Sequence, residues 1–469
     1  MIGITSYGAY VPPTRLPFAV IAGRRAVDGA PEKAVAWNDE DAVTMAVEAA
    51  VNCLRGFDRN GVDAVLFAST TYAFREKQAA ALVAKALDLP RVVETSDLSG
   101  SLRAGTTALR SASAAVAAGT ARNVLVIASD CRMAAPNSSL ERNFGDGAAA
   151  FLVGDAEPIA TFGASHTVAD EIVDVWRSEG DRFVHSWEDR YVVQEGYTPN
   201  LIDAVGGLLD KLDASASEFA RFVYVAPDAR SHGAAGRRLR IDPECIQPPL
   251  FGALGNAGVA FAPLLLAAAL ETARAGDHLL VANYGDGADA MALEITGQLE
   301  KLPERRAVSW HLARRRSIGS YGHYLEARGL ESTEWRPPHG PGLSATAHHR
   351  DRDEDIALRG QRCHSCDAIQ FPAQRVCETC FRKDDFEPVR LSDRVGKVVT
   401  YTFDYFFPTP DPPTVVTVTD VDGARMHLQL VDCLPDETRI GLPVEFTFRR
   451  IHESGGRPNY YWKVRPLPD

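Results

Sequence analysis

One short segment occurs twice in this chain, each time in the same order relative to two other segments. FGDGAAAFL at Phe144–Leu152 returns as YGDGADAMAL at Tyr284–Leu293. An apolar strand candidate precedes each copy: RNVLVIAS begins at Arg122 and DHLLVANY at Asp277. Further upstream, DAVLFAS and RFVYVAP form a third matching pair. Three elements repeated in one order indicate a duplicated α/β half.

Residues 1–297 alternate short β-rich runs with Ala-rich runs, which is typical of an α/β fold with buried sheets. The expected helices include Glu40–Leu54, capped by Asn38 and Asp39, and also Glu76–Leu87, Ala104–Ala118 and Val259–Ala275.

Composition and charge exclude several classes of protein. The 469 residues are 45% hydrophobic, enough for a large core, and a net charge of −12 argues against nucleic acid as the main partner. The amino terminus lacks the pattern of an export signal. The cysteines form a metal pattern in a large acidic chain and not a disulfide scaffold, so we expect a reducing, cytoplasmic environment. The longest apolar stretch, Val259–Leu270, is too short to span a bilayer and contains a proline. We expect a buried helix there and no membrane association.

The C-terminal third has a different organisation. Residues 300–357 form a polar, Pro-containing linker with one expected helix near Tyr321–Arg328, and the short alternating strands after the cysteine-rich segment indicate a small β-barrel. The expected divisions are residues 1–156 and 157–298 for the two α/β halves, 299–357 for the linker, 358–390 for a metal ribbon and 391–469 for the barrel.

Four of the eight cysteines form two CxxC pairs, Cys363/Cys366 and Cys377/Cys380, separated by a short spacer. Each pair can present two thiolates to one tetrahedral ion, and four sulfur ligands leave no open position. This spacing predicts a structural zinc site. A rubredoxin-like iron site would use the same ligands, a redox dithiol fits less well, and we interpret His364 as an exposed turn residue.

A family resemblance rests on an ordered series of motifs: NDEDAVTMAVEAAV, ETSDLSGSLRAGTTAL, NVLVIASD, SSLERNFGDGAAAFLVGD and FGALGNAGVAFAPLLLAAAL. They resemble hydroxymethylglutaryl-CoA synthase and ketoacyl-acyl-carrier-protein synthase III, both of the thiolase superfamily. The resemblance covers residues 1–297 and implies a duplicated, layered α-β-α-β-α fold. The tail resembles the rubredoxin-like zinc ribbon and OB-fold domains that accompany thiolase-like enzymes and bind acyl-CoA. An OB-fold can also bind single-stranded nucleic acid, but no aromatic and basic groove pattern supports that here.

The resemblance places the family's catalytic cysteine at the amino end of the helix that begins near Ala104, where this chain has Leu102. A leucine cannot form an acyl-enzyme. Ser101 and Arg103 flank it, and Ser101 is either a helix cap or a nucleophile that lacks an assigned base. The family's general acid/base Glu maps onto Thr70.

The family's histidine maps onto Ala226 or Pro227 in YVAPDARSH. Asp228, Arg230 and His232 are nearby polar substitutes, with the alternative that the segment only starts a capped helix.

This chain does match the family at the positions that surround the thioester oxygen. Asn256 matches the family's active-site Asn, and Gly285–Gly287 match the glycine turn that lines its cavity. An amide donor aimed at a thioester oxygen stabilises an enolate as it forms. Glu141 matches a Glu that borders the family's site, or is a surface helix residue.

Four further residues have two interpretations each. Tyr72 and Tyr284 are candidate phenolic acid/base groups, or ordinary buried aromatic residues. Cys131 and Cys245 are candidate displaced nucleophiles, but neither aligns with the family's cysteine, and single thiols of this kind are more often packing residues.

Loss of the nucleophile with retention of an enolate site predicts aldol or retro-aldol chemistry on a β-hydroxyacyl-CoA, with acyl-CoA as the substrate. One alternative is a condensing enzyme of the hydroxymethylglutaryl-CoA synthase type. Another is a catalytically silent subunit that passes acyl-CoA to a thiolase-like partner. The superfamily also implies a homodimer.

Overall fold

The computed structural model describes residues 1–330, 344–454 and 457–468. Part of the expected linker, including WRPPHGPG, lies outside the described residues. The chain divides into two compact units, residues 1–37, 41–84 and 89–324 in the first and residues 38–40, 85–88 and 325–469 in the second. Among the described residues, every helix is too short or too polar to cross a membrane.

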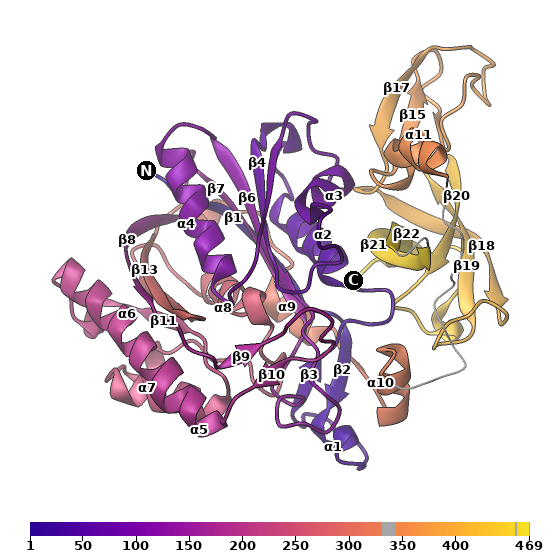
Figure 1. Ribbon diagram of the computed structural model, residues 1–469. Helices are drawn as coiled ribbons and strands as arrows, with labels where there is room; N and C mark the ends of the chain where they lie inside the picture. Colours follow the sequence, from indigo (N-terminus) through magenta and orange to yellow (C-terminus); the bar gives the residue numbers. More distant parts are fainter. Residues whose placement is uncertain (331–343, 455–456, 469) are drawn as a thin grey trace. The chain divides into compact units, whose positions relative to one another are not determined.

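The first unit contains a mirrored arrangement of strands (Figure 1). In spatial order they are β11 (Arg221–Tyr224), β12 (His278–Tyr284), β13 (Gly287–Ile295), β8 (Ala160–Ala169), β1 (Gly3–Tyr10), β7 (Gly147–Gly154), β6 (Asn123–Asp130), β4 (Ala64–Ala68) and β5 (Glu94–Leu98). The series β11-β12-β13-β8 mirrors β4-β6-β7-β1, and β1 pairs with β8 at the centre. The duplicated α/β half that the sequence predicts is confirmed.

Helices cover both faces of these strands. α2 (Ala42–Cys53) packs on β1, β6 and β7, and α6 (Thr198–Leu212) packs on β8 and β13 (Figure 1). Between the two halves lie α4 (Ala104–Ala117) and α8 (Phe261–Leu270), because α8 contacts β7 of one half and β11 and β12 of the other. This gives the layered α-β-α-β-α order of the thiolase fold.

The remaining elements of this unit are short. They are α1 (Phe18–Ile21), α3 (Ala79–Ala86), α5 (Asp189–Tyr191), α7 (Ala229–Arg238), α9 (Val308–Ala313) and α10 (Tyr321–Ala327, which continues into the second unit), with strands β14 (Arg316–Ser317), β2 (Thr14–Pro17) and β3 (Glu32–Ala34) in one small sheet and β9 (Val175–Trp176) with β10 (His185–Ser186) in another.

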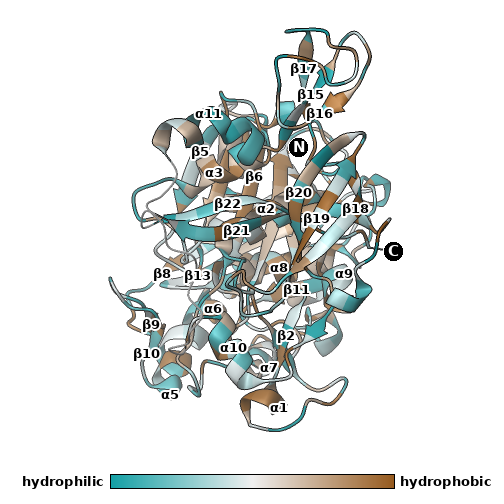
Figure 2. Ribbon diagram, turned by 90° about the vertical axis from the view of Figure 1, so that its right-hand side faces the viewer, coloured by the Kyte–Doolittle hydropathy of each residue, from teal (hydrophilic) through white to brown (hydrophobic). Residues whose placement is uncertain are grey.

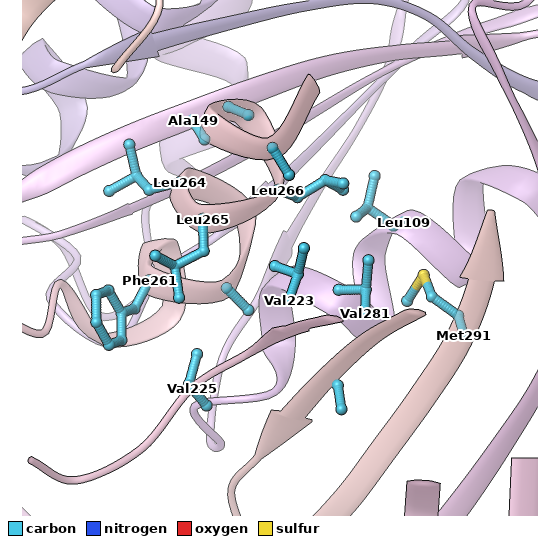
Figure 3. Packing of buried hydrophobic residues seen from close by; sticks show 14 of the residues in the cluster. Leu109, Ala149, Val223, Val225, Phe261, Leu264, Leu265, Leu266, Val281 and Met291 are labelled. Carbon is cyan, nitrogen blue, oxygen red and sulfur yellow. The ribbon is translucent and has the colours of Figure 1, made fainter. Parts of the chain in front are cut away.

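α8 is the buried helix expected from the apolar run, although it begins at Phe261 after a 3-10 turn and ends at Leu270. Nine of its ten residues are buried. Figure 3 shows Phe261, Leu264, Leu265 and Leu266 among side chains of the neighbouring strands and of α4: Ala149, Val223, Val225, Val281, Met291 and Leu109. Such an all-round apolar surface is what a helix between two sheets requires.

α2 shows how local sequence sets a helix start. The capping residue is Asp41 and not Asn38 or Asp39, because the Asp41 carboxylate accepts hydrogen bonds from the backbone N–H groups of Val43 and Thr44. The Thr44 hydroxyl in turn accepts one from the Asp41 N–H at 2.9 Å. This reciprocal arrangement satisfies N–H groups that a helix start otherwise leaves unpaired.

The second unit contains the helix α11 (Ala345–Asp355), which is mostly hydrophilic (Figure 2), a three-stranded sheet and a closed barrel. The sheet consists of β16 (Ile369–Gln370), β15 (Arg359–Cys363) and β17 (Phe386–Arg390). The barrel strands, in spatial order, are β18 (Val395–Asp404), β19 (Thr414–Val421), β20 (Ala424–Leu430), β22 (Arg457–Pro466) and β21 (Pro443–Ser454). Alternate residues of β19 are buried, as a barrel with a filled interior requires. The expected small barrel is confirmed.

The four CxxC cysteines lie together at the end of β15 and in the loops that follow. Their sulfur atoms are all within 4.8 Å of one another, and Cys363–Cys380 and Cys366–Cys377 are each 3.6 Å apart. Four sulfurs bound tetrahedrally to Zn²⁺ at about 2.3 Å would be about 3.8 Å apart. The donor set therefore fits one four-thiolate metal ion, which would cross-link a segment with little core of its own.

We expect Cys363→Ser to remove the metal and to unfold the ribbon, because metal binding to such a site supplies much of its folding free energy. The measurement is metal content by mass spectrometry together with thermal unfolding. The control is Cys433→Ser, a cysteine outside the cluster. Equal metal content and equal unfolding temperatures in both variants would contradict a structural metal.

Candidate active site

A pocket opens in the first unit where the two halves meet. Its wall consists of the carboxyl end of β12, short segments that follow β6 and β11, segments at the starts of α4 and α8, and segments around β9 and α5. These include Leu102, Arg132, Leu140, Asn143, Phe144, Asp174, Val193, Ala226, Asp228, Asn256, Phe261, Asn283 and Tyr284. Ligand sites of α/β sheets commonly lie beyond the carboxyl ends of parallel strands. The duplicated fold therefore brings distant segments together at one site.

Leu102 lies in the pocket wall immediately before α4. Its carbonyl accepts a hydrogen bond from the Asn283 side chain at 3.2 Å. The backbone at Gly285 also lies close to Leu102. A side chain at position 285 would be crowded, because its Cβ would lie only 3.1 Å from both the backbone nitrogen and the Cβ of Leu102. Among the described residues that line the pocket there is neither a cysteine nor a histidine.

Asn256 also lines the pocket, just before the 3-10 turn that leads into α8. Its Oδ1 accepts a hydrogen bond from the Gly258 N–H at 2.9 Å, which fixes the orientation of the amide. Its Nδ2 donates to the Ala226 carbonyl at 3.3 Å. Since an amide nitrogen carries two hydrogens, one donor remains for a ligand oxygen.

Asp174 and Tyr284 are neighbouring ionisable residues of the pocket wall, and both are buried. Burial, and after it the Asp174 carboxylate, raise the pKa of the Tyr284 hydroxyl. Burial also raises the pKa of Asp174. The buried hydroxyl has no hydrogen-bond partner of good geometry among the described residues, although Asp174 is near enough to affect its pKa. Two neighbouring groups with perturbed pKa values in one pocket mark a candidate site for acid–base chemistry.

Gly196 makes room for the Tyr284 hydroxyl. A Cβ at position 196 would lie 2.5 Å from the hydroxyl oxygen, and the Tyr197 ring packs edge-on against the Tyr284 ring at 5.5 Å. The packing thus holds Tyr284 in place.

Thr70 and Tyr72 do not line the pocket. The Thr70 hydroxyl donates to the buried Asp130 carboxylate at 2.9 Å, alongside the hydroxyls of Ser69 and Thr71. The Tyr72 hydroxyl donates to the carbonyls of Phe67 and Leu98. Both residues make structural hydrogen bonds at the carboxyl end of β4.

Ser101 and Arg103 hold the turn between β12 and β13. The Ser101 hydroxyl donates to the Gly285 carbonyl at 3.0 Å. The Arg103 guanidinium donates to the carbonyls of Gly285, Asp286 and Val168. These donors are directed at backbone oxygens, and neither residue lines the pocket.

Asp228 lines the pocket as the N-cap of α7, where it accepts hydrogen bonds from the N–H and the hydroxyl of Ser231. His232 lies outside the pocket lining. Its ring stacks on Tyr224 with centroids 4.2 Å apart, its Nε2 is buried without a hydrogen bond in the described structure, and burial lowers its pKa to about 4. His232 is therefore neutral at physiological pH.

Glu141 is fully buried beside the pocket but does not line it. Its carboxylate accepts hydrogen bonds from the Tyr321 hydroxyl at 2.8 and 2.9 Å and from the Asn137 N–H at 2.7 Å. Its carbonyl accepts one from Lys33 Nζ. Glu141 thus fixes the loop whose next residues, Asn143 and Phe144, form part of the pocket wall.

Of the residues singled out from the sequence, the structure brings Asn256, Asp228 and Tyr284 together with Leu102. Asp174 and Arg132 were missed. Asp174 lies in a loop without any motif, and Arg132 follows a strand as an ordinary polar residue would. Only the fold shows that both are buried and line the pocket.

Three parts of the chain match known protein families. Residues 96–171 match 3-oxoacyl-[acyl-carrier-protein] synthase III, residues 350–387 match the rubredoxin-like zinc ribbon domain of ChsH2, and residues 388–449 match the C-terminal OB-fold domain of ChsH2.

Curated relatives and solved structures agree with this assignment. Hydroxymethylglutaryl-CoA synthase of Aeropyrum pernix is 33% identical over 344 residues (70% of this chain, 94% of that protein), and the enzyme of Archaeoglobus fulgidus is 32% identical over 341 residues (70% and 98%). The structure is similar to MvaS in complex with 3-hydroxy-3-methylglutaryl coenzyme A (TM-score 0.63, 22% identity, 73% and 95% of the two chains). It is also similar to synthase III of Thermus thermophilus (0.57, 25%, 63% and 99%). With these relatives, the chain belongs to the hydroxymethylglutaryl-CoA synthase family of the thiolase superfamily and carries a ChsH2-type zinc ribbon and OB-fold after it.

Proposed function

We propose that the pocket catalyses aldol or retro-aldol chemistry on a β-hydroxyacyl-CoA through a thioester enolate, without an acyl-enzyme. The observation that carries this proposal is Leu102, which lies in the pocket wall where the family resemblance places a nucleophilic cysteine. The two pocket serines, Ser139 and Ser186, have no pocket-lining histidine among the described residues to activate them. Acyl transfer to the protein is therefore disfavoured.

The enolate needs donors at the position of the thioester oxygen. The Asn256 amide has one hydrogen available. The Leu102 N–H, close to the start of α4, has no acceptor among the described residues. Two fixed donors at a buried site stabilise a developing oxyanion more than water does, because they need no reorganisation during the reaction.

Asp174 and Tyr284 supply the proton transfers. Asp174 removes the proton of the β-hydroxyl group, and the C–O bond becomes a carbonyl as the Cα–Cβ bond breaks. The electron pair of that bond passes to the thioester as the enolate. Tyr284 then protonates Cα and recovers its proton from Asp174. The carbonyl fragment and the shortened acyl-CoA leave, and no proton is gained or lost overall.

The proposal also covers partners. A homodimer and a thiolase-like partner subunit remain predictions. Relatives of this fold in complex with coenzyme A or with an acetyl donor acyl carrier protein support an acyl thioester as the ligand.

We expect the purified protein to convert a β-hydroxyacyl-CoA to a carbonyl compound and a shortened acyl-CoA with no mass adduct on the chain. Tyr284→Phe and Asp174→Asn should each lower kcat about 100-fold or more, because each removes a proton-transfer group. The controls are Tyr401→Phe in the barrel and Asp181→Asn near Asp174, neither of which lines the pocket. The measurement is product analysis with intact-protein mass spectrometry.

Two results would favour one of the alternative functions instead. An acyl adduct would contradict the proposal and favour a condensing enzyme. Turnover that needs a thiolase partner and is unaffected by Asn256→Ala would favour a silent subunit.

The pH dependence follows from Asp174. Burial raises its pKa above 3.8, and only the ionised carboxylate accepts a proton. We therefore expect kcat to rise with pH through an apparent pKa above 3.8, and to stay high through neutral pH because Tyr284 remains protonated. A pH profile of single-turnover rates checks this. A rate that is independent of pH, or an unchanged profile in Asp174→Asn, would contradict the role of Asp174.

A further inference from the structure

A polar pair of residues interrupts the apolar sheet face on which α4 packs. Val281 of β12 pairs with Met291 of β13, and both side chains lie in the core near Leu109 of α4 (Figure 3). Two positions further along the strands, the pair consists of Asn283 and Asp289. Residues two apart on a strand lie on the same face, so this pair also faces α4. Asn283 belongs to the pocket wall, and the face therefore becomes polar where it reaches the pocket.

Asp289 is a deeply buried carboxylate, with a residue exposure of 1%. Its two oxygens lie 3.0 and 2.9 Å from Thr106 Oγ1, and Thr106 is its one side-chain hydrogen-bond partner among the described residues. Burial raises the pKa of Asp289 to about 6, although the Thr106 hydroxyl and then the guanidinium groups of Arg103 and Arg110 act in the opposite direction. Asp289 is therefore mostly ionised above neutral pH, and the Thr106 hydroxyl then donates to it.

A carboxylate at this position costs stability. It loses its hydration on burial, and one hydroxyl donor replaces only part of what water supplied. An apolar residue at position 289 would extend the core that Val281 and Met291 form. The packing of the core thus does not explain Asp289, whereas its connection to the pocket does.

The Thr106 hydroxyl makes that connection. Its oxygen accepts a hydrogen bond from Asn283 Nδ2 at 3.3 Å. The same Nδ2 donates to the Leu102 carbonyl at 3.2 Å, and Asn283 Oδ1 accepts from the Tyr284 N–H at 3.0 Å. Both hydrogens of Nδ2 are then engaged, so the amide has a fixed orientation. It joins the peptide before α4 to the end of β12.

Asp289 also decides how the Thr106 hydroxyl is oriented. The Arg103 carbonyl is a competing acceptor, 3.0 Å from Thr106 Oγ1. A hydroxyl group has one hydrogen, so it donates either to that carbonyl or to the carboxylate. The ionised carboxylate is the stronger acceptor. It therefore fixes the hydroxyl in one orientation, in which the oxygen accepts from Asn283.

We propose that Thr106 and Asp289 are positioning residues, which hold the Asn283 amide and through it the Leu102 peptide and Tyr284. Neither Thr106 nor Asp289 lines the pocket, so both act without touching the substrate. This inference rests on the proposed function, in which the Leu102 N–H contacts the thioester oxygen and Tyr284 protonates Cα.

The test is the infrared band of the thioester carbonyl of butyryl-CoA, labelled with carbon-13 at that carbonyl and bound to excess protein at a pH of about 8, where Asp289 is ionised. Donors at the carbonyl oxygen lower its stretching frequency, so the band of the bound thioester should lie below that of the free thioester. Thr106→Val should lose about half of this shift, because one of the two proposed donors, the Leu102 N–H, is no longer held in place. Asp289→Leu should reduce the shift as well, without lowering the unfolding temperature.

The matched control is Thr107→Val, an exposed threonine at the next position of α4, which should keep the full shift. Thr106→Ser should also keep it, because the hydroxyl remains. A role in stability alone would change the unfolding temperature of Thr106→Val and leave the band of the bound thioester unchanged.

A full shift in Thr106→Val or in Asp289→Leu would overturn the inference and leave the proposed function standing. If Thr106→Val fails to fold, a full shift in Asp289→Leu overturns it by itself. A wild type that does not bind butyryl-CoA, or binds it without any shift, would overturn both the inference and the proposed pair of donors.

Discussion

The buried carboxylate of Asp130 is the interaction on which the pocket depends. Asp130 is the last residue of β6. Its carboxylate accepts hydrogen bonds from hydroxyl groups in the segment after β4 and from the Val259 N–H in the turn before α8. A buried carboxylate with this many donors resists movement, because loss of any one donor leaves charge uncompensated. The turn before α8 contains Asn256 and Gly258, and Arg132 follows Asp130 by two residues, so this carboxylate helps to set the positions of all three. One residue thus ties both halves of the duplicated fold to the pocket wall.

The substitutions at the pocket form a consistent set. Where the family resemblance places a thiol, a carboxylic acid and an imidazole, this chain has Leu102, Thr70 and Ala226 or Pro227. Thr70 has become a donor to Asp130, and Leu102 and Ala226 contribute to the wall. A thiol and an imidazole are absent from the described pocket lining, whereas Asn256, the proposed oxyanion donor, lies in it. This combination supports the proposed reaction, which passes through an enolate without a covalent intermediate.

The sequence predicted the fold well where a pattern spans many residues. The repeated glycine turns predicted the mirrored sheet, the apolar run predicted α8, and the CxxC spacing predicted the sulfur cluster. The site was predicted only in part. Asn256 and Tyr284 were singled out because each lies in or next to a motif, and both line the pocket. Asp174 and Arg132 line it too, but their burial depends on segments far away in the chain. His232 shows the reverse: a residue of catalytic type that packs on Tyr224 outside the pocket lining.

Exchange of the α-hydrogens of an acyl-CoA with deuterated water, followed by nuclear magnetic resonance in the presence of the carbonyl fragment, tests the central claim most directly. Formation of an enolate in this pocket predicts deuterium at Cα with the wild type, little or none with Asn256→Ala, and an unmodified protein mass throughout. Absence of exchange in the wild type, or exchange that accompanies an acyl adduct on the protein, would contradict the account.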